Sequence, residues 1–154
     1  MVSYWDWAVA VHGREGVDAA LTELQDAHGQ CVAYLLWAAW AASEGRPLDE
    51  VILAQAAALA RHWELNATGP LRAARRGLKA AAPPIDDQAR SALREQVRSA
   101  EFAAERLLME TLEALAPAPE GPAGDLGRAM IEAGLGWSER APPAALRDLA
   151  SRLA

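Results

Sequence analysis

The chain of 154 residues carries 21 acidic and 15 basic side chains, for a formal net charge of −6. This balance argues against a general nucleic-acid-binding protein and against a membrane-surface protein, because both usually need a positive field. The single cysteine excludes a disulfide framework, and no basic and apolar leader with a cleavage site is present, so we expect a cytoplasmic protein.

Alanine and leucine dominate the composition and β-branched residues are sparse, which favours helix throughout. At this length, one domain with its own hydrophobic core is the default organisation. We therefore predict an all-α fold. It is a compact single-domain helical bundle in which one long helix packs across a central apolar helix.

The first three helices follow one another closely. Ser3 is placed to cap the first helix, Asp6 is placed to complete a capping box with it, and Gly13 ends the helix. The second, residues 17–28, is amphipathic. The third, residues 31–42, is apolar on every side, and its length of about 18 Å falls short of a bilayer core of roughly 30 Å. We predict that it is buried at the centre of the fold.

The next helices differ in charge. A fourth helix, residues 47–63, is followed by a break at 66–70, where Thr68 is placed to cap the fifth. Four cations of the fifth helix recur at i, i+3, i+4 and i+7 and form a basic stripe: Arg72, Arg75, Arg76 and Lys79. A sixth, long helix runs from about residue 86 to 115. Its apolar seam needs a partner and comprises Leu93, Val97, Ala100, Ala104, Leu107, Thr111 and Leu115.

Residues 116–124 hold three prolines and two glycines, a composition typical of a linker and of a mobile joint. Two short helices are predicted after it, apolar enough to dock and small enough to detach. We therefore divide the chain into a helical domain at 1–115, the linker at 116–124 and a short helical tail at 125–154.

Several short sequence motifs follow one another in a characteristic order. They are Trp5-x-Trp7, Leu24-Gln25-Asp26 with Gly29, Leu35-Leu36-Trp37 with Trp40, Pro70-Leu71-Arg72 with Arg75-Arg76, and Glu101 with Ala104-Glu105-Arg106. In this order they resemble a bacterial conserved-hypothetical family, a domain of unknown function. The resemblance covers about residues 4–115 and implies a recurring helical domain. It implies no reaction type, because that family brings no established activity.

No catalytic residue, cofactor or metal site is predicted. His12 and His28 fall in the last turns of predicted helices, where an imidazole complements the helix end. His62 has neither a second histidine at i+4 nor a cysteine pair nearby, as a zinc site would need. Cys31 lies in the apolar helix without a local base, and no serine occurs in a Gly-x-Ser-x-Gly turn.

Two features leave alternatives open. Five tryptophans fall in the first four helices, where they form either the core or an exposed aromatic pocket or interface: Trp5, Trp7, Trp37, Trp40 and Trp63. The basic stripe either pairs with carboxylates of the long helix, among them Glu101, Glu105 and Glu110, or binds a partner or an anion near the helix start at Thr68.

These features favour a non-enzymatic protein-interaction module, an adaptor or regulator with an unidentified protein partner. We expect neither nucleic acid nor a membrane among its partners, and the oligomeric state stays open. The alternative is a small-molecule-binding or enzymatic domain with a tryptophan-lined pocket and an anionic group held by arginine.

Overall fold

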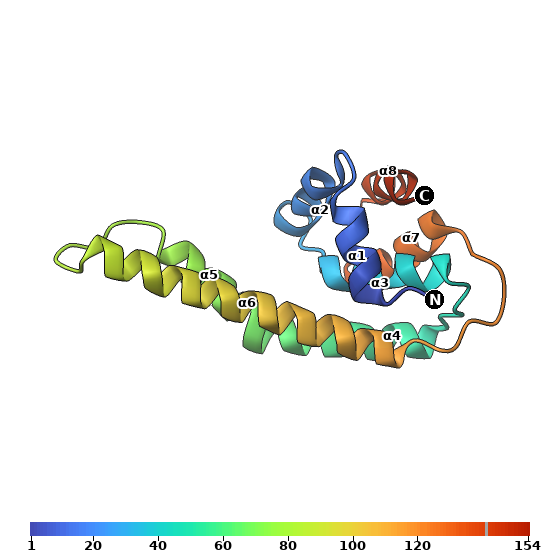
Figure 1. Ribbon diagram of the computed structural model, residues 1–154. Helices are drawn as coiled ribbons and strands as arrows, with labels where there is room; N and C mark the ends of the chain where they lie inside the picture. The colour runs from blue at the N-terminus through green and yellow to red at the C-terminus, as the bar shows by residue number, and fades with distance from the viewer. Residues whose placement is uncertain (141) are drawn as a thin grey trace. The chain divides into compact units, whose positions relative to one another are not determined.

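The computed structural model describes residues 1–140 and 142–154, and every regular element in these residues is a helix (Figure 1). This confirms the predicted all-α fold class. The helices are α1 (Tyr4–His12), α2 (Val17–Asp26), α3 (Val32–Ser43), α4 (Glu50–Trp63), the π-helical turn η1 (Glu64–Thr68), α5 (Gly69–Gly77), α6 (Asp87–Leu115), α7 (Leu126–Trp137) and α8 (Pro143–Leu153).

The helices form two compact units. The core unit comprises Met1–Ala60 and Met109–Ala154, and the hairpin unit comprises Arg61–Leu108. Both boundaries fall inside helices, one near the end of α4 and the other within α6. The core unit is therefore built from two segments that are far apart in the chain.

Helix α3 is the centre of the core unit. Every residue from Tyr34 to Ala41 is buried, as the uninterrupted apolar run predicts. Helices α1, α2 and α7 pack against α3, and α8 packs against α2 and α7. Ser3 caps α1 as expected, since its Oγ accepts a hydrogen bond from the Asp6 amide and donates one to the Asp6 carboxylate. Over the described residues, no helix is both long and apolar enough to cross a bilayer.

The predicted tail lies within the core unit. Its two helices bury Met130 and Ala133 on α7 and three leucines on α8. The preceding linker contains no helix, but two of its backbone amides donate hydrogen bonds to the end of α3 and the turn after it: Gly124 N to Ala42 O and Glu120 N to Gly45 O. That residues 1–115 form a domain of their own stays a prediction, and loss of α7 would uncover part of α3.

The hydrogen bond between Glu120 N and Gly45 O requires a glycine at position 45. Its φ is +65°, and an added Cβ would collide with the carbonyl of Gly121. We expect Gly45→Ala to lower the free energy of unfolding by about 2 kcal/mol. Gly77 ends α5 with open space around it, so Gly77→Ala should instead raise that free energy by about 0.5 kcal/mol. Urea denaturation of both variants measures the contrast, and equal effects would contradict it.

The hairpin unit corrects the prediction of a break at residues 66–70. There α4 continues through η1 into α5, and Thr68 has helical dihedral angles, makes no capping hydrogen bond and is buried. The Gly69 amide donates to the Glu64 carbonyl, and Pro70 has no N–H to offer. The predicted cap at Thr68 is wrong, and so is the anion site at a free helix start, because α4 continues through η1 into α5 and no helix starts freely here.

The apolar seam predicted on α6 is also partly wrong. Ala104 is buried as expected, but Leu93 and Leu107 are exposed, and Glu101 and Leu108 are buried instead. The buried face is thus rotated from the predicted one. On this face Glu101 is paired with Arg72 and Arg75 of α5, and the periodicity of α6 alone does not reveal that pairing.

Candidate functional site

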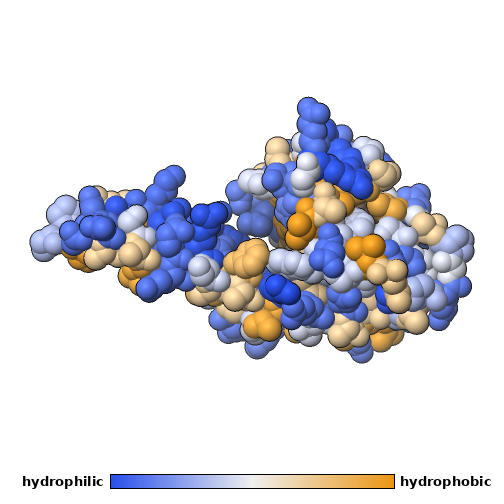
Figure 2. Space-filling model, viewed as in Figure 1, coloured by the Kyte–Doolittle hydropathy of each residue, from blue (hydrophilic) through white to orange (hydrophobic). Residues whose placement is uncertain are grey.

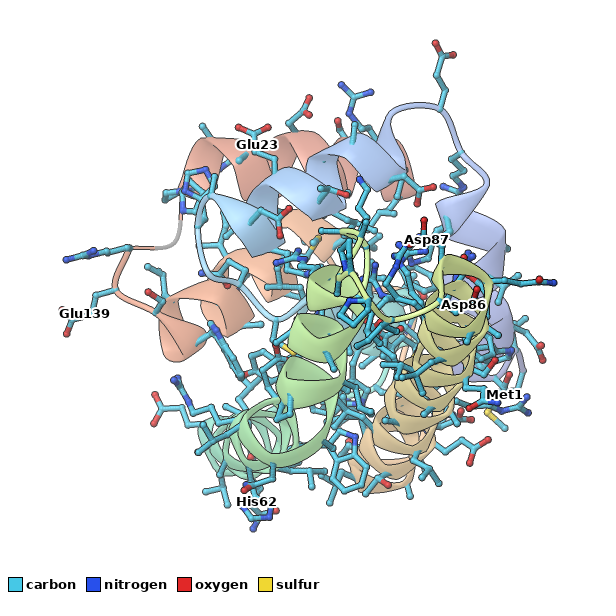
Figure 3. The ribbon with its side chains drawn as sticks, turned by 90° about the vertical axis from the view of Figure 1, so that its left-hand side faces the viewer. Met1, Glu23, His62, Asp86, Asp87 and Glu139 are labelled. Atoms are coloured by element: carbon cyan, nitrogen blue, oxygen red, sulfur yellow. The ribbon has the colours of Figure 1, made fainter. Side chains whose placement is uncertain are left out.

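The fold divides the predicted basic stripe into two pairs, and its last member, Lys79, lies in the turn after α5. Arg72 and Arg75 are partly buried against α6, which lies beside α5 (Figures 1 and 3). Arg76 and Lys79 are exposed. The first pair therefore serves the structure of the hairpin unit, whereas recognition by the second pair stays a prediction.

Arg72 is the centre of an ion-pair network. Its Nη1 donates to Glu64 Oε1 at 2.7 Å. Its Nε lies 3.4 Å from Glu101 Oε1, and its Nη2 lies 3.6 Å from Glu105 Oε1. Pairing with carboxylates of the long helix was one of the two alternatives for the stripe, and Arg72 makes this pairing with Glu101 and Glu105. Glu64 is an additional partner of Arg72. One guanidinium thus connects η1, α5 and α6.

Arg75 completes the network by pairing with both oxygens of Glu101. The Glu101 side chain is 9% exposed and receives hydrogen bonds or ion pairs from Arg72 and Arg75 together. A buried carboxylate is tolerated only when cations and donors compensate its lost hydration. Glu101 is therefore positioned by two cations that come from another helix.

The π-helical turn η1 supplies the remaining carboxylate. Glu64 lies in its first turn, and the buried Thr68 hydroxyl donates to Glu64 Oε2 at 2.6 Å while Arg72 takes the other oxygen. The sequence predicted a break here with Thr68 as a helix cap, and Glu64 was not among the predicted residues. A π-helical turn inserts one residue into a helix and often occurs at functional sites. The periodicity of the sequence does not predict the π-helical turn. Gly69 permits it, because the Glu64 carbonyl lies where a Cβ would be.

Glu105 has a perturbed pKa. Burial raises it above the ordinary value of 4.5, and the neighbouring Glu101 carboxylate raises it further, while Arg72 opposes the rise. The charged form of Glu105 is therefore less favourable in the folded protein than in the unfolded chain.

We expect Glu105→Gln to change the pH dependence of stability. Because the pKa is higher in the folded state, that state binds more protons just above pH 4.5, and the contribution of Glu105 to stability grows as the pH falls through this window. The parent protein should gain stability relative to the variant on acidification toward pH 4.5. Urea denaturation at a series of pH values measures the difference, and a relative loss would show that the ion pair with Arg72 dominates.

The predicted tryptophans do not form one group. Trp37 and Trp40 are fully buried in the core unit. Trp5 and Trp7 on α1 are half-buried, and so is Trp63 at the end of α4. The indole N–H of Trp40 donates to Val2 O, and that of Trp63 to Ala104 O. The Trp37 N–H has no acceptor among the described residues. Core packing is thus the role of the two central tryptophans.

A sixth tryptophan was not among the predicted site residues. Trp137, at the end of α7, lies with its ring centroid 5.7 Å from that of Tyr34, and its N–H donates to Gly29 O at 2.8 Å. It attaches the tail to the start of α3. Its isolated position in a glycine-rich stretch gave no periodic signal.

The histidines do not converge. His12 Nδ1 lies 2.6 Å from Asp18 Oδ1, and His28 lies in the turn after α2. Figure 3 shows the side chain of His62 pointing away from the helices and far from Asp86 and Asp87 at the start of α6. In the described part of the chain, no three His, Cys, Asp or Glu side chains could hold a metal ion together.

The described residues line cavities that include the following three. The first, of about 410 Å³, lies between the α3–α4 connection and the start of α7 and includes Arg46 and Arg128. A second, of about 470 Å³, lies beside the ion-pair network of the hairpin unit. The third, of about 380 Å³, includes His28 and Arg140. None of these three is lined by tryptophan.

A family model described as "Protein of unknown function (DUF2390)" matches residues 3–112. The chain belongs to this family. The matched residues include α1 to α5 and most of α6, and with them the whole ion-pair network. The match confirms the resemblance to a domain of unknown function. No curated protein and no solved structure matches the chain significantly.

Proposed function

We propose that this DUF2390 protein is a non-enzymatic interaction module, an adaptor or regulator of the bacterial cytoplasm, which binds another protein through its hairpin unit. The observation that carries the proposal is the apolar surface of this unit. Five large apolar side chains in residues 61–108 are 48–76% exposed: Leu65, Ile85, Leu93, Phe102 and Leu107. Apolar groups set among charged ones are typical of the core and rim of protein interfaces.

These five side chains are not among the buried residues of the hairpin unit. In residues 61–108 the buried residues are Thr68, Glu101, Ala104 and Leu108, two of them polar. The helices are instead held by the network around Arg72 and by the hydrogen bond from Trp63 to Ala104. Figure 2 shows apolar and hydrophilic residues interleaved on the visible surface. An isolated pair of helices would bury such leucines, so their exposure supports docking of a partner.

Partner capture with matched surface variants tests the proposal. The full chain is used as bait in native lysate, and captured proteins are identified by mass spectrometry. Leu93→Ser combined with Leu65→Ser should abolish capture of a stoichiometric partner while the melting temperature is retained. Val9→Ser combined with Val51→Ser replaces equally exposed apolar groups of the core unit and should leave capture unchanged.

Two results would count against this function. Capture that survives the leucine substitutions but fails with the valine pair would move the interface to the core unit. A chain that retains no protein, yet copurifies with a stoichiometric metabolite, would favour a small-molecule function instead.

A further inference from the structure

The cavity of the hairpin unit has the features of a ligand site. Its volume of about 470 Å³ falls in the range of small-molecule pockets. All of its lining comes from α5 and α6: Arg75, Arg94, Arg98, Glu101, Phe102 and Glu105. None of these residues was assigned to a small-molecule site from the sequence except Arg75. The cavity is separate from the exposed leucines that support partner binding.

The two carboxylates of the cavity already have cationic partners. Glu101 is paired with Arg75 and Arg72, and Glu105 lies 3.6 Å from Arg72. Arg72 also holds Glu64, outside the cavity. Glu101 and Glu105 thus pair with Arg72 and Arg75 rather than with the remaining two arginines of the lining, which lie further toward the start of α6.

Arg94 and Arg98 have one carboxylate between them. They stand one turn apart on α6 and share Glu95, at 3.7 Å from Arg94 Nη1 and 3.8 Å from Arg98 Nη1, both longer than a hydrogen bond. Arg94 Nε is covered by protein and has no acceptor among the described residues. Leaving a donor of a charged group buried and unbonded is costly. The two guanidinium groups thus border the cavity with unused capacity for an anion.

Phe102 adds an aromatic surface one turn after Arg98. Its side chain is 55% exposed and lines the same cavity. An aromatic face favours a flat apolar group beside it, and arginine pairs well with a planar carboxylate. The nearby Glu101 and Glu105 repel added negative charge, so a single charge is accepted more readily than the double charge of a phosphate.

We propose that this cavity binds a small aromatic carboxylate, whose carboxylate group accepts hydrogen bonds from Arg94 and Arg98 and whose ring lies against Phe102. The ligand site shares only Phe102 with the apolar surface proposed above for a protein partner, and the two leucines changed in the capture experiment do not line it. A failure of either proposal therefore leaves the other intact.

Amide chemical shifts of the full-length, ¹⁵N-labelled chain test the site, with phenylacetate as the probe. We expect saturable shifts near residues 94–105 and a millimolar Kd, as is usual for so small a ligand. Arg94→Gln should raise this Kd at least tenfold. Phe102→Ala should weaken phenylacetate binding and leave the much weaker binding of acetate unchanged. Arg128→Gln, a change at an exposed arginine of the core unit, should have no effect.

Three results would overturn the proposal. They are equal Kd values for Arg94→Gln and Arg128→Gln, tighter binding of inorganic phosphate than of phenylacetate, or shifts that do not saturate. Circular dichroism establishes that each variant is folded. Should Arg94→Gln fail to fold, Arg98→Gln changes a more exposed side chain with the same expected loss, and an unchanged Kd there overturns the site equally.

Discussion

Replacing Trp37 with alanine should lower the free energy of unfolding by about 3–5 kcal/mol, the usual cost of removing a large aromatic side chain from a core. Trp37 is fully buried at the middle of α3 and packs with its ring centroid 5.9 Å from that of Tyr34. The loss is a large share of the stability of a typical domain. Urea denaturation followed by circular dichroism measures it.

Two further variants make this experiment specific. Trp7→Ala removes a half-buried indole from α1 and should cost clearly less. Trp37→Phe retains most of the buried apolar volume and removes the N–H that has no acceptor among the described residues, so it should restore most of the stability. A Trp37→Ala protein that unfolds at the parental urea concentration would refute the central role of α3.

Replacing Glu101 with glutamine should lower the free energy of unfolding by about 3 kcal/mol. The change leaves the partly buried guanidinium groups of Arg72 and Arg75 without their shared carboxylate. Removal of one member of a buried ion pair is costly because the remaining charge stays poorly solvated. Glu95→Gln is the control: this carboxylate is exposed, and its loss should change stability by no more than about 0.5 kcal/mol.

A double-mutant cycle separates the network from a general effect of α6. Combining Glu101→Gln with Arg75→Met should cost less than the sum of the two single changes, because the second change removes the charge that the first leaves uncompensated. Strict additivity would mean that the pair contributes no coupling and that the hairpin unit is held by apolar contacts instead.

The positions of most helices could be predicted from the sequence, because glycine, proline and apolar composition act locally. The burial of Trp37 and Trp40 follows from a segment that has no polar face to expose. The buried face of α6 could not be predicted in the same way, since the burial of Glu101 depends on arginines that α5 brings to it. The turn η1 could not be predicted for a related reason. Asn66 to Pro70 form a typical helix-breaking sequence, whereas in the fold Glu64 receives hydrogen bonds from Thr68, Gly69 and Arg72.

For the site, the sequence predicted which charged residues share a helix face, but not which residues they pair with. Arg72 and Arg75 were found by their spacing, yet their principal partners lie 8 and 26 residues away. Arg94, Arg98 and Phe102 gave no signal as a group, because a cavity appears only when two helices have been brought together. Charge spacing along one helix therefore identifies a face but not what that face contacts.

The packing of α7 against α3 has a consequence for synthesis on the ribosome. Helices α1 and α2 are made before α3, whereas α7 follows α3 roughly 80 residues later, a delay of several seconds at about 5–20 residues per second. During this interval α1 and α2 can pack against α3, but the apolar side of α3 that contacts α7 stays uncovered. The protein is thus expected to engage holding chaperones during translation, and slow codons downstream of α3 should increase its aggregation.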